Sequence, residues 1–301
     1  MPARLTSDRF AAAQAFMHAQ ADPLELALWR LSFEGGERQP VLDALAPFQN
    51  PDGGFGHGLE PDLSTPASSA IATSVGLRHL RRAGAPAAHP MVAGALRWLA
   101  ANIEDGVWPI IDARVDDAPH APWWAYDSDL AQRWQGFRFN PTAEILAHLY
   151  HFRDGAPADL IAAAEARMRR TVGEFALIDG AYDLRCAALL AEAPGVPQDL
   201  REALSALLLR SVVRHDAADE HAPALDLAPR PDSLLAGPLK DQLEPAAAAL
   251  VDGQTADGGW SPFWDWGFVD EAAWAKAKKT WRGSLTRLAV EALAAHGRVD
   301  R

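Results

Sequence analysis

One tight turn recurs along the chain and limits the possible folds more than any other feature. Each copy has Asp, then Gly, then any residue, then an aromatic residue. The four copies are Asp52–Phe55, Asp105–Trp108, Asp179–Tyr182 and Asp257–Trp260. In such a turn Asp bonds the local backbone, Gly takes a positive φ, and the buried aromatic ring fixes the turn. Four copies set between helical patterns predict a repeat architecture.

An amide side chain precedes three of these turns. Gln49, Asn102 and Gln254 each stand three residues before the Asp, whereas the third copy has Ala176 there. An amide both donates and accepts, so it can bond backbone groups left open where a helix ends. We therefore expect the amides to tie one unit to the next, and we expect the third turn to be degenerate.

Helical patterns fill the sequence between the turns, and no segment has a convincing strand pattern. Caps and periodicity predict helices over 7–20, 23–33, 41–48, 66–82, 90–102, 157–175, 183–193, 198–213, 243–251 and 270–279, another that opens at Asn140-Pro141, and a last one that contains Leu285–Leu293. Thr65 is the predicted cap of the helix over 66–82. Long loops are expected at about 109–140 and 215–238. The chain is thus predicted to be all-α, a single domain over 1–301 built from helical hairpins.

Composition narrows the class of protein. With 49% hydrophobic residues, the 301-residue chain can bury a substantial core. A formal charge of -12 argues against a nucleic-acid partner. No apolar run is long enough to span a membrane, and the first twenty residues lack the apolar region of a signal peptide. A cytoplasmic location is the default expectation, and composition leaves the oligomeric state open.

The pattern Gln-x-x-Asp-Gly-Gly-Phe/Trp at a helix end, followed by a helix that opens near Thr or Ser, resembles the repeat of the terpenoid cyclase and protein prenyltransferase superfamily. Residues 41–83 and 247–297 carry the resemblance best, and residues 91–153 carry it more weakly. The resemblance implies an (α/α)6 toroid, in which inner helices surround a cavity and outer helices wrap them. It also implies an apolar, isoprenoid-type small-molecule substrate.

The catalytic motifs of that superfamily are absent. Neither 112–117 nor 127–130 matches the Asp-x-Asp-Asp motif of proton-initiated cyclases, and there is no Asp-Asp-x-x-Asp magnesium motif. No Cys follows Asp252, where the resemblance would place a zinc-binding thiolate. We therefore expect no metal and no cofactor.

Candidate acids lie in two loops. Asp127 or Asp129, in the long loop, is the predicted proton donor, with Asp62 and Glu60 as further candidates. A buried carboxyl group has a raised pKa, which suits a general acid. The simpler interpretation of Glu60 and Asp62 is a loop that supports a helix N-terminus.

Aromatic residues are the predicted binding groups. They are His57, Trp123, Trp124, Tyr126, Trp134, Trp264 and Trp266. Aromatic faces can stabilise a carbocation or stack on a sugar ring. Alternatively, the long loop is a lid folded by its own aromatic residues and solvated by acids such as Asp116 and Asp117, and the last two tryptophans belong to the core.

Three functions stay open. The leading hypothesis is a terpenoid-cyclase-like enzyme, in which an Asp protonates an alkene inside an aromatic cavity. The second is a carbohydrate lyase or hydrolase that uses paired carboxylates on a similar toroid. The third is a non-catalytic toroid that binds a lipid or a partner.

Overall fold

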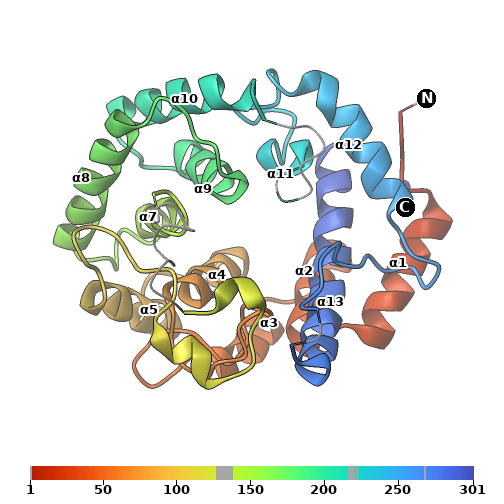
Figure 1. The fold of residues 1–301 in the computed structure, drawn as a ribbon. Coiled ribbons are helices and arrows are strands. Elements are labelled where there is room, and N and C mark those ends of the chain that lie inside the picture. Colours follow the sequence, from red (N-terminus) through yellow and green to blue (C-terminus); the bar gives the residue numbers. More distant parts are fainter. Residues whose placement is uncertain (1, 127–137, 216–220, 222, 268) are drawn as a thin grey trace. The chain divides into compact units, whose positions relative to one another are not determined.

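The structure is a computed structural model that describes residues 2–126, 138–215, 221, 223–267 and 269–301. The α-helices are α1 (Ser7–Gln20), α2 (Pro23–Phe33), α3 (Gln39–Leu45), α4 (Ala70–Arg82), α5 (Pro90–Ala101), α7 (Thr142–His151), α8 (Ala158–Glu174), α9 (Ala181–Glu192), α10 (Gln198–Val212), α11 (Ala224–Leu227), α12 (Lys240–Asp252) and α13 (Glu271–Ala295). The 3-10 helices are η1 (Ala46–Phe48), η2 (Ala113–Asp117) and η3 (Pro122–Trp124). These residues contain isolated bridges but no strand, which confirms the predicted all-α class for the described part of the chain (Figure 1).

The chain contains two compact units. Leu45–Ser211 form one, which we call the middle unit. Met1–Ala44 and Val212–Arg301 form the other, which we call the terminal unit. The single-domain organisation over 1–301 stays a prediction.

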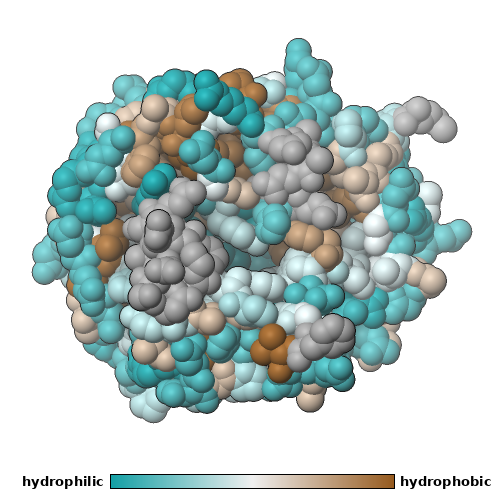
Figure 2. Space-filling view, in the orientation of Figure 1, coloured by the Kyte–Doolittle hydropathy of each residue, from teal (hydrophilic) through white to brown (hydrophobic). Residues whose placement is uncertain are grey.

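The middle unit has an inner and an outer layer of helices. Inner helix α7 contacts both α4 and α9, while α5 and α8 lie outside them (Figure 1). Every residue of α7 from Thr142 to Tyr150 is buried, whereas α8 buries a single stripe between Leu160 and Val172. Accordingly, hydrophilic residues line the outer edge along α8, and hydrophobic residues gather on its inner side toward α9 and α10 (Figure 2). The two layers follow from these burial patterns.

The terminal unit is organised around α13, which contacts both α1 and α2. Its apolar core includes Phe16, Trp29 and Trp260. Within it, Nε of the buried Arg287 donates to Oε2 of the buried Glu25 at 2.6 Å. The pair ties α2 to α13, because each charge is neutralised where water cannot reach it.

The first turn ties two hairpins of the middle unit together. Nε2 of Gln49 donates to the carbonyl oxygens of Gly53 and Met91, both at 2.8 Å. Gly53 has a φ of 94°, and a Cβ there would lie 2.4 Å from the carbonyl oxygen of Gly94 in α5. The backbone N–H of Phe55 donates to the hydroxyl of Thr73 in α4 at 3.1 Å. The turn thus joins the outer helix α5 to the inner helix α4.

The fourth turn repeats this geometry in the terminal unit. Nε2 of Gln254 donates to the carbonyl oxygens of Gly258 and Arg9, both at 2.9 Å. Gly258 has a φ of 91°, and a Cβ there would lie 2.3 Å from the carbonyl oxygen of Ala12 in α1. The backbone N–H of Trp260 donates to a threonine hydroxyl in α13 at 3.0 Å. The amide bond predicted to connect one repeat to the next is therefore present at both of these turns.

The other two turns depart from that geometry. In the second, Gly106 has a φ of 79° and packs on α8, but Asn102 donates to Trp98 of its own helix at 2.8 Å. Asn102 therefore does not make the predicted hydrogen bond to the next repeat. In the third, Gly180 has a φ of -86° and serves as the N-cap residue of α9. The third copy is thus a helix start rather than a positive-φ turn.

Helix α4 begins later than predicted. Its N-cap is Ser69, whose hydroxyl accepts from the N–H of Ala72, so Thr65 is not the cap. The carbonyl oxygens of Pro66 and Ala67 face the first turn, where a Cβ on Gly56 would approach them to 2.5 and 2.3 Å. Contacts with the turn therefore keep these residues out of the helix.

The C-terminal region also differs from the prediction. The helices predicted at 270–279 and around Leu285–Leu293 form one continuous helix, α13. The loop predicted over 215–238 contains the short helix α11. None of the described helices combines the length and the apolar character needed to cross a membrane.

Candidate functional site

Two loops of the middle unit pack together along their backbones. One precedes α4, and the other is the long loop after α5. Leu63 and His120 form an isolated antiparallel bridge between them. Next to it, the N–H of Ala121 donates to the carbonyl oxygen of Asp62 at 2.9 Å. The two loop clusters predicted as separate candidates therefore belong to one surface.

Glu60 and Asp62 lie together in the loop before α4. Asp62 is buried, with 4% of its surface exposed, while Glu60 keeps partial contact with solvent. Burial, followed by the negative charge of Asp62, raises the pKa of Glu60 to about 8, against the opposing charge of Arg78. A carboxyl group with this pKa holds its proton at neutral pH, so Glu60 can act as a general acid.

Arg78 and Glu144 join the inner helices α4 and α7. Nε of Arg78 donates to Oε1 of Glu144 at 2.7 Å, and Nη2 of Arg78 donates to Oε2 of Glu144 at 2.9 Å. The side chain of Glu144 is 5% exposed and that of Arg78 is 44% exposed. Burial by itself raises the pKa of Glu144, but Arg78 and His148 outweigh burial and hold that pKa well below its usual range. The carboxylate is therefore charged inside the protein, with its cation reaching solvent.

His148 lies one helical turn after Glu144 in α7 and is 1% exposed. Its Nε2 is 3.5 Å from Oε1 of Glu144, and neither ring nitrogen has a hydrogen-bond partner within the described residues. Burial lowers the pKa of His148, as do Arg81 and Arg78, against the opposing effect of Glu144. The imidazole is therefore neutral at physiological pH.

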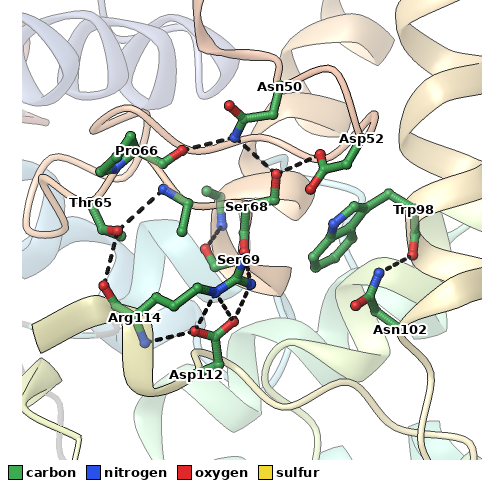
Figure 3. Close-up of polar contacts among 12 residues, drawn as sticks. Asn50, Asp52, Thr65, Pro66, Ser68, Ser69, Trp98, Asn102, Asp112 and Arg114 are labelled. Atoms are coloured by element: carbon green, nitrogen blue, oxygen red, sulfur yellow. Dashed lines mark hydrogen bonds and ion pairs between the residues drawn. The ribbon is translucent and has the colours of Figure 1, made fainter. Parts of the chain in front are cut away.

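A small recess of about 10 Å³, with room for about one water molecule, lies at the start of α4 (Figure 3). It is lined by Thr65, Ala67, Ser68, Ser69, Ile111, Asp112 and Val115. Nε of Arg114 donates to the carboxylate of Asp112 at 2.9 and 3.1 Å, and its carbonyl oxygen accepts from the Thr65 hydroxyl at 3.1 Å. The hydroxyl of Ser68 donates to Asp52 at 2.8 Å. Because these polar groups bond one another, the recess is a seam between two loops.

The aromatic residues predicted to bind substrate in the middle unit differ in exposure. Trp124 is 6% exposed, Trp123 is half-buried, and Tyr126 is 45% exposed. His57 is exposed, has a left-handed φ of 57°, and places Nε2 2.8 Å from Oδ1 of Asn50. His57 thus supports the first turn, while Tyr126 exposes its ring to solvent.

Trp264 and Trp266 belong to the terminal unit. The ring of Trp264 packs edge-on against Phe263 at 4.9 Å and Trp281 at 5.1 Å, measured between ring centroids. Trp266 is 1% exposed and lies 5.8 Å from Trp274. Trp266 therefore fills the interior of its unit, whereas Trp264 is partly exposed.

Asp127, Asp129 and Trp134 lie outside the described residues, so their predicted roles stay predictions. Just before them, Asp116 pairs with Nε2 of His120 at 3.2 Å and accepts from the N–H of Tyr126 at 2.9 Å. Among the residues that the structure describes, no three His, Cys, Asp or Glu side chains are grouped to hold a metal ion.

No sequence motif marks Arg78, Glu144 or His148 as functional residues. Glu144 and His148 are four residues apart, a spacing that places both on one face of a helix. The sequence contains that spacing, but the apolar stripe of the same helix is the stronger pattern and indicates core packing. The partnership with Arg78 joins two helices, and no local pattern signals it.

Comparison with known proteins adds no relative. The chain matches no protein-family model, and a search of the curated proteins finds no similar protein. What the site does is therefore argued from its geometry and from the turn motif.

Proposed function

We propose that the chain is an enzyme that donates a proton from Glu60 to its substrate, on an (α/α)6 toroid of the terpenoid-cyclase type. The observation that carries this proposal is the Glu60–Asp62 pair at the junction of the two loops. The pKa of Glu60, raised to about 8, keeps the acid protonated at neutral pH. This proposal assigns the proton donor to Glu60, in the loop before α4, instead of to Asp127 or Asp129.

The surroundings of Glu60 suit both halves of a proton transfer. Before transfer, burial and the charge of Asp62 favour the protonated acid. After transfer, Glu60 is a carboxylate, and the positive charge of Arg78 favours that form. Glu144 fixes Arg78 through two hydrogen bonds, so this charge is held in place during the reaction. The substrate cation would then be stabilised by aromatic faces of the long loop, such as the exposed ring of Tyr126.

The repeated turns support the toroid. The first and fourth turns use the same amide link, the same positive-φ glycine and the same threonine acceptor, although they lie in different units. In the middle unit the glycine packs on the outer helix α5 and the aromatic residue's N–H bonds the inner helix α4, and in the terminal unit the corresponding helices are α1 and α13. Repeated helical hairpins predict a repeated joint, so two matching joints favour one series of repeats.

A second candidate is a carbohydrate lyase or hydrolase with paired carboxylates. The favouring observation is that the surroundings raise the pKa of Glu60 and lower that of Glu144. When the surroundings shift the pKa values of two carboxyl groups apart, one group commonly acts as the acid and the other as the base. However, both oxygens of Glu144 already accept from Arg78, which limits its use as a base.

A product assay distinguishes these candidates. Purified protein is incubated with squalene and with linear polyprenyl alcohols, acids and phosphates in one arm, and with oligosaccharides in the other. The proposal predicts cyclised polyprenyl isomers of unchanged mass, lost in Glu60→Gln and kept in the control Glu174→Gln, which changes an exposed glutamate of α8. New reducing ends or unsaturated sugars would support the second candidate. Products that persist in Glu60→Gln would refute the role of Glu60, and no product in either arm would favour a binding protein.

A further inference from the structure

Helices α4 and α7 pack against each other in the middle unit (Figure 1), and both carry basic residues in their last turns. Arg78 and Arg81 stand three residues apart on α4, so their side chains share a face. His148 and His151 share a face of α7 in the same way. Glu144 is the carboxylate among them, and we call these five residues the α4–α7 basic cluster.

Glu144 is fully occupied by one arginine. Each of its oxygens accepts from a different nitrogen of Arg78, at 2.7 and 2.9 Å. Arg81 is close enough to Glu144 to feel its charge, but it has no hydrogen bond or ion pair with it. One negative charge therefore offsets one of the two guanidinium charges, and the other is left without a partner in the cluster.

Arg81 is the unusual member of the cluster. It is partly buried, and no hydrogen bond or ion pair engages its guanidinium group within the described residues. An arginine near a helix C-terminus is stabilised by the helix dipole. The guanidinium nitrogens of Arg81 keep some contact with solvent, so they remain open to a ligand that supplies hydrogen-bond acceptors.

The neighbours of Arg81 do not supply the missing negative charge. His148 has no hydrogen-bond partner in the described structure. His151, exposed on α7, lies near enough for the charge of Arg81 to act on it. Nearby Glu60 carries a proton at neutral pH. The cluster thus presents guanidinium donors and a net positive charge.

We propose that the α4–α7 basic cluster binds an anionic group, a carboxylate or a phosphate, with Arg81 as the principal ligand. Arg78 contributes its remaining terminal nitrogen, which no carboxylate uses in the described structure. Planar guanidinium groups suit both kinds of anion because they present several donors in one plane. This assigns an acidic head group to the substrate of Glu60, and only that last step rests on the proposed function.

The test is binding of a simple anion, measured without any reaction. Inorganic phosphate is titrated into the full chain at constant ionic strength, and the histidine ring signals are followed by NMR. Sodium acetate in a second titration separates carboxylate from phosphate preference. The variants are Arg81→Gln, Arg81→Lys and the control Arg97→Gln, which changes an exposed arginine of α5 in the same unit.

Saturable shifts of His148 and His151 are expected in the unchanged protein and in Arg97→Gln. In Arg81→Gln the dissociation constant should rise by about tenfold or more, because a charged hydrogen bond is lost. Arg81→Lys should recover part of the affinity, since it keeps the charge. Thermal unfolding checks that each variant is folded. Shifts that do not saturate, or equal affinity in Arg81→Gln and Arg97→Gln, would overturn the proposal.

The two proposals fail in different ways. Loss of phosphate binding in Arg81→Gln with no effect of Glu60→Gln on products would uphold the anion site and refute the acid. Products that depend on Glu60, together with phosphate binding that does not depend on Arg81, would do the reverse.

Discussion

Glu144 accepts hydrogen bonds on both of its oxygens from Arg78, which stands 66 positions away in the chain. The two residues join inner helices α4 and α7, and they fix a positive charge beside Glu60. The acid, its neighbouring charge and the basic cluster all depend on this contact. Replacing Arg78 or Glu144 separately therefore tests the contact.

Removing Arg78 should destabilise the protein more than removing Glu144. Arg78→Met leaves a buried carboxylate unpaired, at a cost of about 3 kcal/mol. Glu144→Gln leaves a cation that reaches water, at a cost of about 1 kcal/mol. Denaturant unfolding measures both, with Arg97→Met as an exposed control expected to be near neutral. Equal costs for the two variants, or the reverse order, would contradict the assigned charges.

Glu60 should make stability depend on pH. Its pKa is raised from 4.5 to about 8 in the folded state, so the folded protein holds an extra proton between these values. The free energy of unfolding should therefore be highest, as far as Glu60 contributes, below pH 4.5, and should fall as pH rises toward 8. Glu60→Gln should flatten this fall by more than about 1 kcal/mol. Identical pH profiles for the two proteins would count against the raised pKa.

The turn glycines should not tolerate a side chain. Gly53→Ala and Gly258→Ala each place a Cβ within 2.4 Å of a carbonyl oxygen at a positive φ. Each should cost roughly 2–4 kcal/mol, because backbone strain and overpacking act together. Gly173→Ala, in α8 with no atom within 4 Å of the new Cβ, should be neutral or stabilising. Urea unfolding measures the loss of unfolding free energy in each variant. Equal losses at all three sites would show that the turns are not close-packed.

The two linking glutamines should be equivalent. Gln49→Ala and Gln254→Ala each leave two carbonyl oxygens without their amide donor, at a cost of about 1–3 kcal/mol. Asn102→Ala should cost less, because Asn102 bonds its own helix at a more exposed site. The comparison uses unfolding free energies under one condition. A cost for Asn102→Ala equal to the other two would mean that the amide link is not what these turns have in common.

Local signals account for what the sequence predicted well. The bounds of α1 and α2 follow from caps and from Pro23 at a helix start, which act within a few residues. The Gln49 and Gln254 links were predictable because an amide before a turn has few nearby partners. The closed ring stays a prediction, supported by the turn geometry.

Contacts between distant segments account for what the sequence did not reveal. Thr65 has the features of a cap, but the first turn holds the residues after it outside the helix. Glu60 was a candidate, yet the raised pKa that sets it apart from the other acids depends first on burial, which only the fold provides. Arg81 stands out because it lacks a partner in the described structure, and no sequence pattern reports such a lack.

The most direct test of the central claim is the pKa of Glu60, read by NMR from its side-chain carboxyl carbon across a pH titration. Glu60→Gln assigns the signal by removing it. The account predicts a midpoint of about 8, far above that of an exposed glutamate such as Glu174. A midpoint near 4.5 for Glu60 would contradict its role as the proton donor.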